Sequence, residues 1–299
     1  MNGRWGGIAG PQAPSHRRGG PARIAVASGK GGTGKTTVAV SLARVHDGPV
    51  LLADCDVEDP DARLFLQGST LGLEVVSVPV PTVDRDRCDG CGACSRVCRF
   101  HAIVVPSDHS LVLPELCHGC GACVEACPNA AIRETGRRIG TVETFEAGHV
   151  VLVEGRLDVG VAKAVPLVRA VRDRIAGSLP AILDAPPGTS CPVVATLRGA
   201  DCALLVAEPT PFGLHDLRLA VEMARKVGVP FGVVINRAGT GDGGVHSFCR
   251  GEGIPVLLEI PDDRRIAEAY SRGEILVQEF PEHRRAIQGL LSRVIHEGP

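Results

Sequence analysis

The sequence is poor in aromatic residues and in lysine. Phe, Trp and Tyr together make up 3% of the 299 residues, so the core has to be built mainly from aliphatic side chains. Lysine occurs only four times, at Lys30, Lys35, Lys163 and Lys226, and arginine supplies the remaining basic residues. Each lysine can therefore be considered individually.

The sequence also lacks a strong net charge and a long hydrophobic run. The formal net charge is −2 at pH 7, so we expect no nucleic-acid partner. No stretch approaches the ~18 apolar residues of a membrane span, which makes a membrane partner unexpected. Residues 1–22 are rich in Gly, Pro and Arg and lack the apolar region of a secretion signal. This composition predicts a disordered tail and a cytoplasmic protein.

Cysteine, in contrast, is abundant. The chain has twelve cysteines, and clustered thiols in a reducing cytosol bind metal more often than they form disulfides. Eight of them form two runs, "CDGCGACSRVC" from Cys88 and "CHGCGACVEAC" from Cys117, each spaced C-x₂-C-x₂-C-x₃-C. This spacing is that of bacterial two-cluster ferredoxins, in which the fourth cysteine of each run ligates the other cluster.

Two [4Fe–4S] clusters are therefore predicted, with ligands exchanged between the runs. The first is assigned to Cys88, Cys91, Cys94 and Cys127, and the second to Cys117, Cys120, Cys123 and Cys98. Zinc is the alternative, but structural zinc sites usually combine two distant cysteine pairs and leave no role for a third cysteine in the run. Arg99 stands where such runs usually have proline, which affects the turn after Cys98 rather than the ligands.

Seven short apolar runs have the character of buried strands. They lie at 23–28, 49–54, 149–155, 180–186, 202–209, 231–237 and 254–261. Runs without polar alternation are typical of parallel strands covered on both faces, and amphipathic segments such as 213–228 lie between them. The pattern predicts a doubly wound α/β domain with a mostly parallel sheet.

The α/β pattern is interrupted by the cysteine-rich segment. We predict a small inserted α+β ferredoxin domain at 81–135, and a core domain split into 23–80 and 136–299. The flanking sequences "PVPTV" and "ETGRR" are interpreted as linkers.

The segment "GKGGTGKTT", residues 29–37, contains a complete phosphate-binding loop. Gly29, Gly34, Lys35 and Thr36 match G-x-x-x-x-G-K-[ST], between an apolar run and a helix-compatible run as this motif requires. Backbone N–H groups would surround the phosphates, Lys35 would neutralise them, and Thr36 would hold Mg²⁺. The residues predicted to bind ATP here are Gly29, Lys30, Gly31, Gly32, Thr33, Gly34, Lys35, Thr36 and Thr37.

Acidic residues end two of the predicted strands. Asp54 is the last residue of the run at 49–54, Asp56 lies two residues further on, and Asp184 ends the apolar part of the run at 180–186. Because parallel strands bring their carboxyl ends to one crevice, Asp54 and Asp184 are candidates for the Mg²⁺ shell, and Asp56 for orienting the attacking water. The alternative is that these acids cap loops or helices, and the nearby Glu58, Asp59 and Asp61 are left unassigned.

Four segments together resemble a known family. "GKGGTGKTT", "DCD", "DAPPGTS" and "VVINR" are similar to the MinD/ParA/Mrp group of deviant-Walker P-loop ATPases, and more closely to MinD-superfamily ATPases with an inserted ferredoxin domain. The resemblance covers the chain after residue 22. It implies a MinD-like fold, ATP hydrolysis that is slow without a partner, and homodimerisation on ATP binding. It further implies that Lys30 reaches the other subunit's nucleotide as a catalytic cation, and that Asn236 faces adenine.

The remaining cysteines and the last apolar pattern have simpler interpretations. Cys202 and Cys249 are expected to pack in the core. Cys191 is interpreted as structural, with a redox or cluster-transfer role as the alternative, because the nitrogenase iron protein of the same group has a ligating cysteine at that spacing. Ile287, Leu290, Leu291, Val294 and Ile295 share one helical face. We expect this helix to pack on the sheet rather than lie on a membrane.

Three functions are compatible with the sequence. The first, which the full two-cluster spacing favours, is ATP-gated electron transfer to an unidentified redox partner. The second is assembly or carriage of iron–sulfur clusters or another metallocofactor for a client protein. The third is a positioning or regulatory ATPase whose clusters sense redox state.

Overall fold

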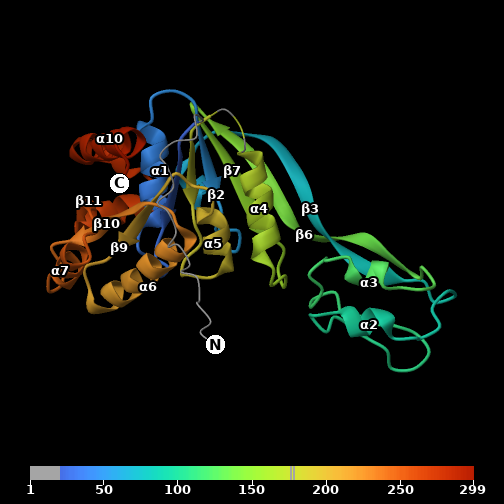
Figure 1. Cartoon of the computed structure of the whole chain (residues 1–299). Coiled ribbons are helices and arrows are strands. Elements are labelled where there is room, and N and C mark those ends of the chain that lie inside the picture. Colours follow the sequence, from blue (N-terminus) through green and yellow to red (C-terminus); the bar gives the residue numbers. More distant parts are fainter. Residues whose placement is uncertain (1–20, 176, 178) are drawn as a thin grey trace, which may run out of the picture.

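The computed structural model describes residues 21–299 except 176 and 178. One large sheet lies at the centre of this part of the chain (Figure 1). Its nine strands have the order β11-β10-β9-β1-β8-β2-β7-β6-β3. The first seven in this order run parallel, and β6 and β3 are antiparallel additions at one edge. The strands are β1 (Arg23–Ala27), β2 (Val50–Asp54), β3 (Ser69–Val83), β6 (Ile132–Ala147), β7 (Val150–Leu157), β8 (Ala181–Asp184), β9 (Cys202–Ala207), β10 (Phe231–Ala238) and β11 (Val256–Pro261). The predicted tail, 1–22, lies almost entirely outside the described residues.

Helices cover both faces of this sheet. One apolar core joins the sheet to α4 (Ala164–Arg174), α5 (Cys191–Leu197), α6 (Pro211–Val227) and α7 (Gly244–Gly251). A second core, on the other face, joins it to α1 (Lys35–Val45), α9 (Leu276–Glu279) and α10 (Pro281–His296). A 3₁₀ turn, η1 (Ala62–Phe65), and the helix α8 (Arg264–Ser271) complete the core. The predicted doubly wound α/β architecture is confirmed.

The aliphatic runs form the strands predicted for them. All seven correspond to β1, β2, β7, β8, β9, β10 and β11, because Val, Ile, Leu and Ala fill both faces of the central strands. The amphipathic segment 213–228 becomes most of α6. Cys202 and Cys249 are buried as expected. In α10, the residues Ile287, Leu290, Leu291 and Val294 are buried against the sheet, which confirms the packing interpretation of the last apolar pattern.

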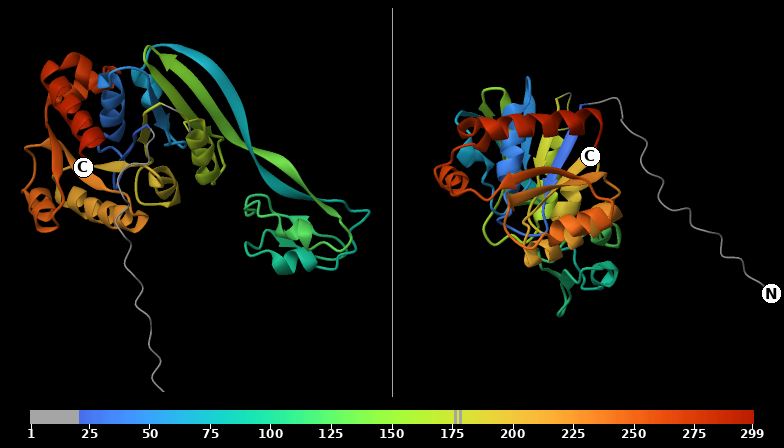
Figure 2. Two further views of the ribbon diagram at one scale, coloured as in Figure 1. Left: turned by 45° about the horizontal axis from the view of Figure 1, so that its top comes forward. Right: turned by 90° about the vertical axis from the view of Figure 1, so that its left-hand side faces the viewer.

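The cysteine-rich segment stands away from the core at the end of a long two-stranded ribbon (Figure 2). β3 and β6 pair from Ser69 with Glu146 to Val83 with Ile132, and the chain between them carries α2 (Ala93–Val97), α3 (Ala122–Glu125) and the short pair β4 (Ile103–Val104) and β5 (Leu111–Val112). This segment, residues 84–131, is called the arm below. Its small apolar core includes Val83 and Ile132, the last pair of the ribbon, and is separate from the two cores of the sheet.

The interpretation of "PVPTV" and "ETGRR" as linkers is wrong. Both lie within the ribbon, where Val80 pairs with Thr135 and Pro79 with Gly136. Proline cannot donate a ladder hydrogen bond, but it is tolerated in an edge strand when its nitrogen faces away from the neighbour. β3 is the edge strand of the sheet, so its prolines are compatible with strand structure.

None of the helices in the described residues has the length and apolar character needed to cross a bilayer.

Removal of the arm should leave the core folded. Replacing residues 84–131 by an Asn-Gly turn between the directly paired Val83 and Ile132 closes a regular hairpin. Because the arm has its own small core, we expect cooperative thermal unfolding with a midpoint within about 4 °C of the intact chain. Circular dichroism and calorimetry measure this. A non-cooperative transition would show that the arm is part of the folding unit.

Candidate functional site

The loop between β1 and α1 has the backbone that a phosphate-binding loop needs. Gly32 and Gly34 have φ angles of 74° and 89°, in the left-handed region that favours glycine. At Gly34 a Cβ atom would also lie 2.4 Å from the amide nitrogen of Asn236, so a larger residue would both strain the backbone and displace that amide. Thr33 and Lys35 are buried at the start of α1. The backbone conformation of the loop therefore depends on its two left-handed glycines and on the close approach of Asn236 from β10.

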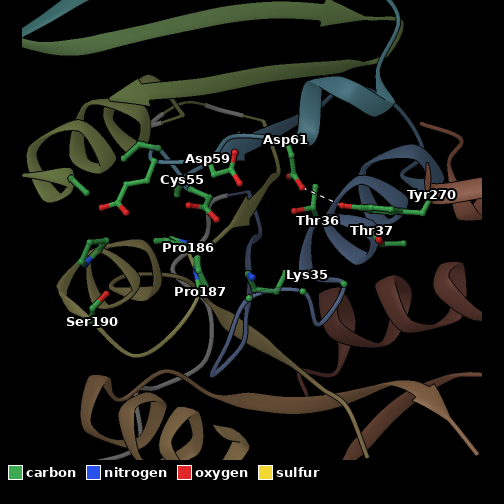
Figure 3. Close-up of a pocket in the computed structure, with 18 residues that line it drawn as sticks. Lys35, Thr36, Thr37, Cys55, Asp59, Asp61, Pro186, Pro187, Ser190 and Tyr270 are labelled. Atoms are coloured by element: carbon green, nitrogen blue, oxygen red, sulfur yellow. Dashed lines mark hydrogen bonds between the residues drawn. The ribbon is translucent and has the colours of Figure 1, made fainter. Parts of the chain in front are cut away.

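A cavity of about 320 Å³ lies beside this loop at the carboxyl edge of the sheet (Figure 3). The loop, the segment after β2 and the segment after β8 form its walls. Among its lining residues are Gly31, Gly32, Gly34, Lys35, Thr36, Thr37, Cys55, Asp56, Asp61, Pro186, Pro187, Ser190 and Tyr270. The structure thus brings Asp56 and six of the nine predicted loop residues together around one cavity, and Gly29, Lys30 and Thr33 are not among its lining residues.

Asp184 is a buried acid without a hydrogen-bond donor. Its side chain is 1% exposed at the end of β8, and neither carboxylate oxygen has a partner at hydrogen-bonding distance among the described residues. Burial raises its pKa from 3.8 to about 7, although the nearby Thr36 hydroxyl and the Lys35 ammonium partly oppose this shift. Carboxylate and hydroxyl oxygens are preferred ligands of Mg²⁺, so Asp184 and Thr36 fit a magnesium site.

Asp54 makes contacts of a different kind. Its Oδ1 accepts the backbone N–H of Asp56 at 3.1 Å, and its Oδ2 accepts those of Asp61 and Ala62 at 3.1 and 3.0 Å. It therefore holds the loop after β2 in place. Burial, followed by the charge of Asp184, raises its pKa well above the usual value. The assignment of Asp54 to Mg²⁺ stays a prediction beside this structural role.

Asp56 lies where a water-orienting carboxylate could act. It lines the cavity, and burial raises its pKa to about 6 while the charge of Lys35 lowers it. Near pH 7 the group is mainly a carboxylate that can accept a proton.

Two further parts of this region escaped the sequence analysis. Tyr270, from α8, donates a hydrogen bond from its hydroxyl to Asp61 Oδ2 at 3.3 Å, and both residues line the cavity (Figure 3). Glu154 is buried within β7, in register with Asp54, which is itself in register with Asp184. Burial raises the pKa of Glu154, and Arg156 opposes this from 3.0 Å. Three acids thus form a row across adjacent strands.

Lys30 and Asn236 have protein partners in this structure. The Lys30 ammonium lies 2.7 Å from Glu208 Oε2. The Asn236 amide donates to the Thr33 carbonyl at 2.9 Å and so braces the phosphate-binding loop from β10. Neither residue is among those that line the cavity. The roles of Lys30 across a dimer and of Asn236 at adenine stay predictions.

The eight arm cysteines are grouped around two small hollows. One hollow is lined by Cys88, Cys91, Cys94 and Cys127, and the other by Cys98, Cys117, Cys120 and Cys123. Each hollow thus takes three cysteines from one run and the fourth from the other run. Gly92 and Gly121, both left-handed, precede α2 and α3 and turn the chain after the second cysteine of each run.

Backbone N–H groups point at several of these sulfurs. Ala102 donates to Cys98 Sγ at 3.3 Å and Ala131 donates to Cys127 Sγ at 3.2 Å, so the two fourth cysteines have equivalent partners. Hydrogen bonds of this kind favour the thiolate, and the Gly90 N–H in the same way lowers the pKa of Cys88. The cysteines of each set line a hollow and do not converge on a single metal ion. In the described residues no three His, Cys, Asp or Glu side chains lie close enough together to hold one metal ion.

One contact joins the arm to the core beside the cavity. The Lys163 ammonium, just before α4, donates to the backbone carbonyl of Cys117. The next residue, Ala164, lines the cavity. Cys191 is exposed at the first position of α5, between the cavity residues Ser190 and Pro192.

The fold and the phosphate-binding loop define a nucleotide-binding protein of the P-loop class. The chain belongs to the CobQ/CobB/MinD/ParA nucleotide binding domain family, which matches residues 24–277. The septum site-determining protein MinD of Pyrococcus horikoshii, solved with Mg-ADP, has a similar fold, with a TM-score of 0.56 and 20% identity over 92% of this chain and 96% of that one.

Two curated proteins illustrate the range of sequence relatives. Uncharacterized protein MJ0579 of Methanocaldococcus jannaschii is 29% identical over 279 residues, which are 91% of this chain and 97% of that protein. The cytosolic Fe-S cluster assembly factor Nubp2 homolog of Anopheles gambiae is 29% identical over 119 residues, 34% of this chain and 46% of that protein.

The buried carboxylate of Asp184 should destabilise the nucleotide-free protein at neutral and alkaline pH. Its folded-state pKa is raised, so stability falls as pH rises from about 4 to about 7. Asp184→Asn removes this cost and should stabilise the protein by roughly 2–4 kcal/mol at pH 8, with a smaller gain toward pH 4. Denaturant unfolding in EDTA at pH 5 and pH 8 measures the two gains. Equal gains at both values would contradict a raised pKa.

Proposed function

We propose that this protein is an ATPase in which an ATP-driven dimer switch controls electron transfer through two [4Fe–4S] clusters. One observation carries the proposal: each hollow of the arm is lined by four cysteines, three from one run and one from the other. That is the ligand exchange of two-cluster ferredoxins. The family membership and the cavity beside the phosphate-binding loop support the ATPase part.

The cavity and the residues next to it would supply the parts that phosphoryl transfer needs. Lys35 and the backbone of the loop would bind the phosphates, and Thr36 and Asp184 would hold Mg²⁺. Asp56 would orient the attacking water and accept its proton. Lys30 of a second copy would add positive charge at the γ-phosphate, in the way that an arginine finger does.

The arm fits the clusters by its sulfur donors and its backbone. A bound [4Fe–4S] cluster would take up or release one electron at low potential. The protein's part is to hold four thiolates around each hollow and to direct N–H groups at them, which tunes the potential. The stacked rings of Phe100 and His118, with centroids 3.9 Å apart, form part of the lining of the second hollow.

Lys163 is the most direct link between the two sites. Its ammonium contacts the carbonyl of Cys117, and the following residue lines the nucleotide cavity. A nucleotide that moves the start of α4 would therefore also move a positive charge near the second hollow.

The alternative function is assembly or carriage of iron–sulfur clusters, with the clusters as cargo for a client protein. The similarity to an Fe-S cluster assembly factor over a third of this chain favours it. Cargo clusters would leave the protein in an ATP-dependent way, whereas electron carriers would remain bound through many turnovers. A redox-sensing regulatory ATPase is the third possibility, distinguished by ATP hydrolysis that depends on cluster oxidation without delivery of electrons.

Anaerobically purified protein should be brown and contain about eight irons per chain, as two four-iron clusters require. Cys127→Ser should perturb the same cluster as Cys88→Ser, and Cys98→Ser the same cluster as Cys117→Ser, because the paired residues line the same hollow. Iron analysis and electron paramagnetic resonance measure this. Cys191→Ser, outside the arm, is the matched control and should retain all the iron. If Cys127→Ser instead reproduced Cys117→Ser, each run would hold its own cluster.

Nucleotide should shift the reduction potential of the Cys117 cluster, and Lys163→Gln should reduce that shift. The substitution removes the charge next to Cys117 and should also make the potential more negative. By linkage, about 59 mV corresponds to a tenfold difference in ATP affinity between the two oxidation states. Redox titration with and without a non-hydrolysable ATP analogue measures both effects.

Two variants control this titration. Lys226→Gln removes a lysine that pairs with Glu222 on α6, far from the arm, and should leave the potentials unchanged. Lys35→Ala should abolish nucleotide binding and with it any nucleotide-dependent shift. The proposed electron transfer is wrong if the potential does not respond to nucleotide. If clusters are then also transferred to an apo-protein in an ATP-dependent way, the assembly function takes its place.

A further inference from the structure

Lys30 is held by a buried acid in the single chain. Its ammonium lies 2.7 Å from Glu208 Oε2, and the Glu208 side chain is only 8% exposed whereas that of Lys30 is 35% exposed. Glu208 directly follows β9, next to the strand that leads into the phosphate-binding loop. An ion pair with one buried partner is screened less by water than a surface pair.

Glu208 has a second cation. Arg237, at the end of β10, places Nη1 2.7 Å from the other oxygen, Oε1. Arg237 is one of the few residues other than glycine with a left-handed backbone, at φ 56°. Such a conformation persists only where its surroundings enforce it, and the Arg237 N–H is also bonded to the Asn236 side chain at 3.0 Å. The Arg237 side chain is 55% exposed, and its guanidinium is the second partner of Glu208.

The acid itself has little freedom to follow Lys30. A Cβ atom on Gly213, in the first turn of α6, would lie 2.1 Å from the Glu208 carbonyl oxygen, so the backbone around Glu208 is tightly packed against this helix. If Lys30 leaves, Glu208 stays in place. Glu208 is then still paired with Arg237 and does not become an unpaired buried charge. An unpaired buried charge would be strongly destabilising.

We propose that Glu208 is a positioning residue that holds Lys30 in the monomer and competes with the partner subunit's nucleotide for it. Lys30 leaves this ion pair only for a more strongly anionic group. That group is the terminal phosphate of a nucleotide bound to a second copy. Arg237 allows the exchange because it keeps Glu208 neutralised throughout. This inference rests on the role of Lys30 across a dimer in the proposed function and adds the group that controls it.

Lysine reactivity tests the restraint without nucleotide or dimer. Competitive acylation followed by mass spectrometry reports each lysine separately, since the chain has only four. Glu208→Gln, which keeps the shape of the side chain, should raise the acylation rate of Lys30 several-fold and leave Lys226 unchanged. Arg237→Gln is the matched control, because it removes the other cation and leaves the Lys30 contact in place. An unchanged rate in Glu208→Gln overturns the restraint.

Dimerisation tests the competition. With a non-hydrolysable ATP analogue, the dimer dissociation constant of Glu208→Gln, measured by analytical ultracentrifugation, should be about tenfold lower than that of the unmodified chain. Arg237→Gln should show no such gain, and the double variant Lys30→Ala/Glu208→Gln should lose it. A faster acylation with an unchanged or weaker dimer overturns the competition. Absence of a nucleotide-dependent dimer in every variant refutes the proposed role of Lys30, while acylation still decides whether Glu208 restrains it.

Discussion

The adjacency of β1, β8 and β2 in the middle of a parallel sheet is the constraint on which the nucleotide site depends. Parallel pairing aligns the carboxyl ends of these strands, so the phosphate-binding loop, Asp184 and Asp54 emerge side by side. The strands can be central only because they are aliphatic on both faces and covered by two separate cores. A buried acid such as Asp184, which has no donor of its own, persists at that edge because the burial of the surrounding strands offsets its cost.

The same sheet also carries the arm. The loop organised by the backbone contacts of Asp54 leads through η1 into β3, and β3 pairs with β6 along the whole ribbon. The arm is therefore connected to the nucleotide site by hydrogen-bonded strands rather than by flexible linkers. If nucleotide changes the orientation of its base, such a connection would carry the change to the arm, and the contact of Lys163 with Cys117 adds a second point of attachment.

The parts of the structure that the sequence predicts are those in which one local pattern decides the outcome. Aliphatic runs predict the central strands, and the glycines of the loop predict its backbone. The ribbon was not predicted because its strands are half exposed and contain Pro79 and Pro81, so neither an apolar run nor clear alternation marks them. Tyr270 reaches Asp61 across 209 residues, and only the packing of α8 brings them together. Glu154 could have been found, because it ends an apolar run as Asp54 and Asp184 do.

Three of the four lysines lie at the nucleotide site or at the junction with the arm, and the fourth, Lys226, pairs with Glu222 on the exposed face of α6. Lys35 lies at the phosphate-binding loop, Lys30 at an acid that it would exchange for a phosphate, and Lys163 at the junction of arm and core. Arginine is the residue of fixed, forked contacts, as Arg138 shows with Asp158, whereas Arg237 makes a single contact with Glu208. An ammonium group is a compact charge on a flexible stem, without directional preference for one partner. Positions whose cation has to change partners with the nucleotide state therefore favour lysine, and positions that brace the resulting geometry favour arginine.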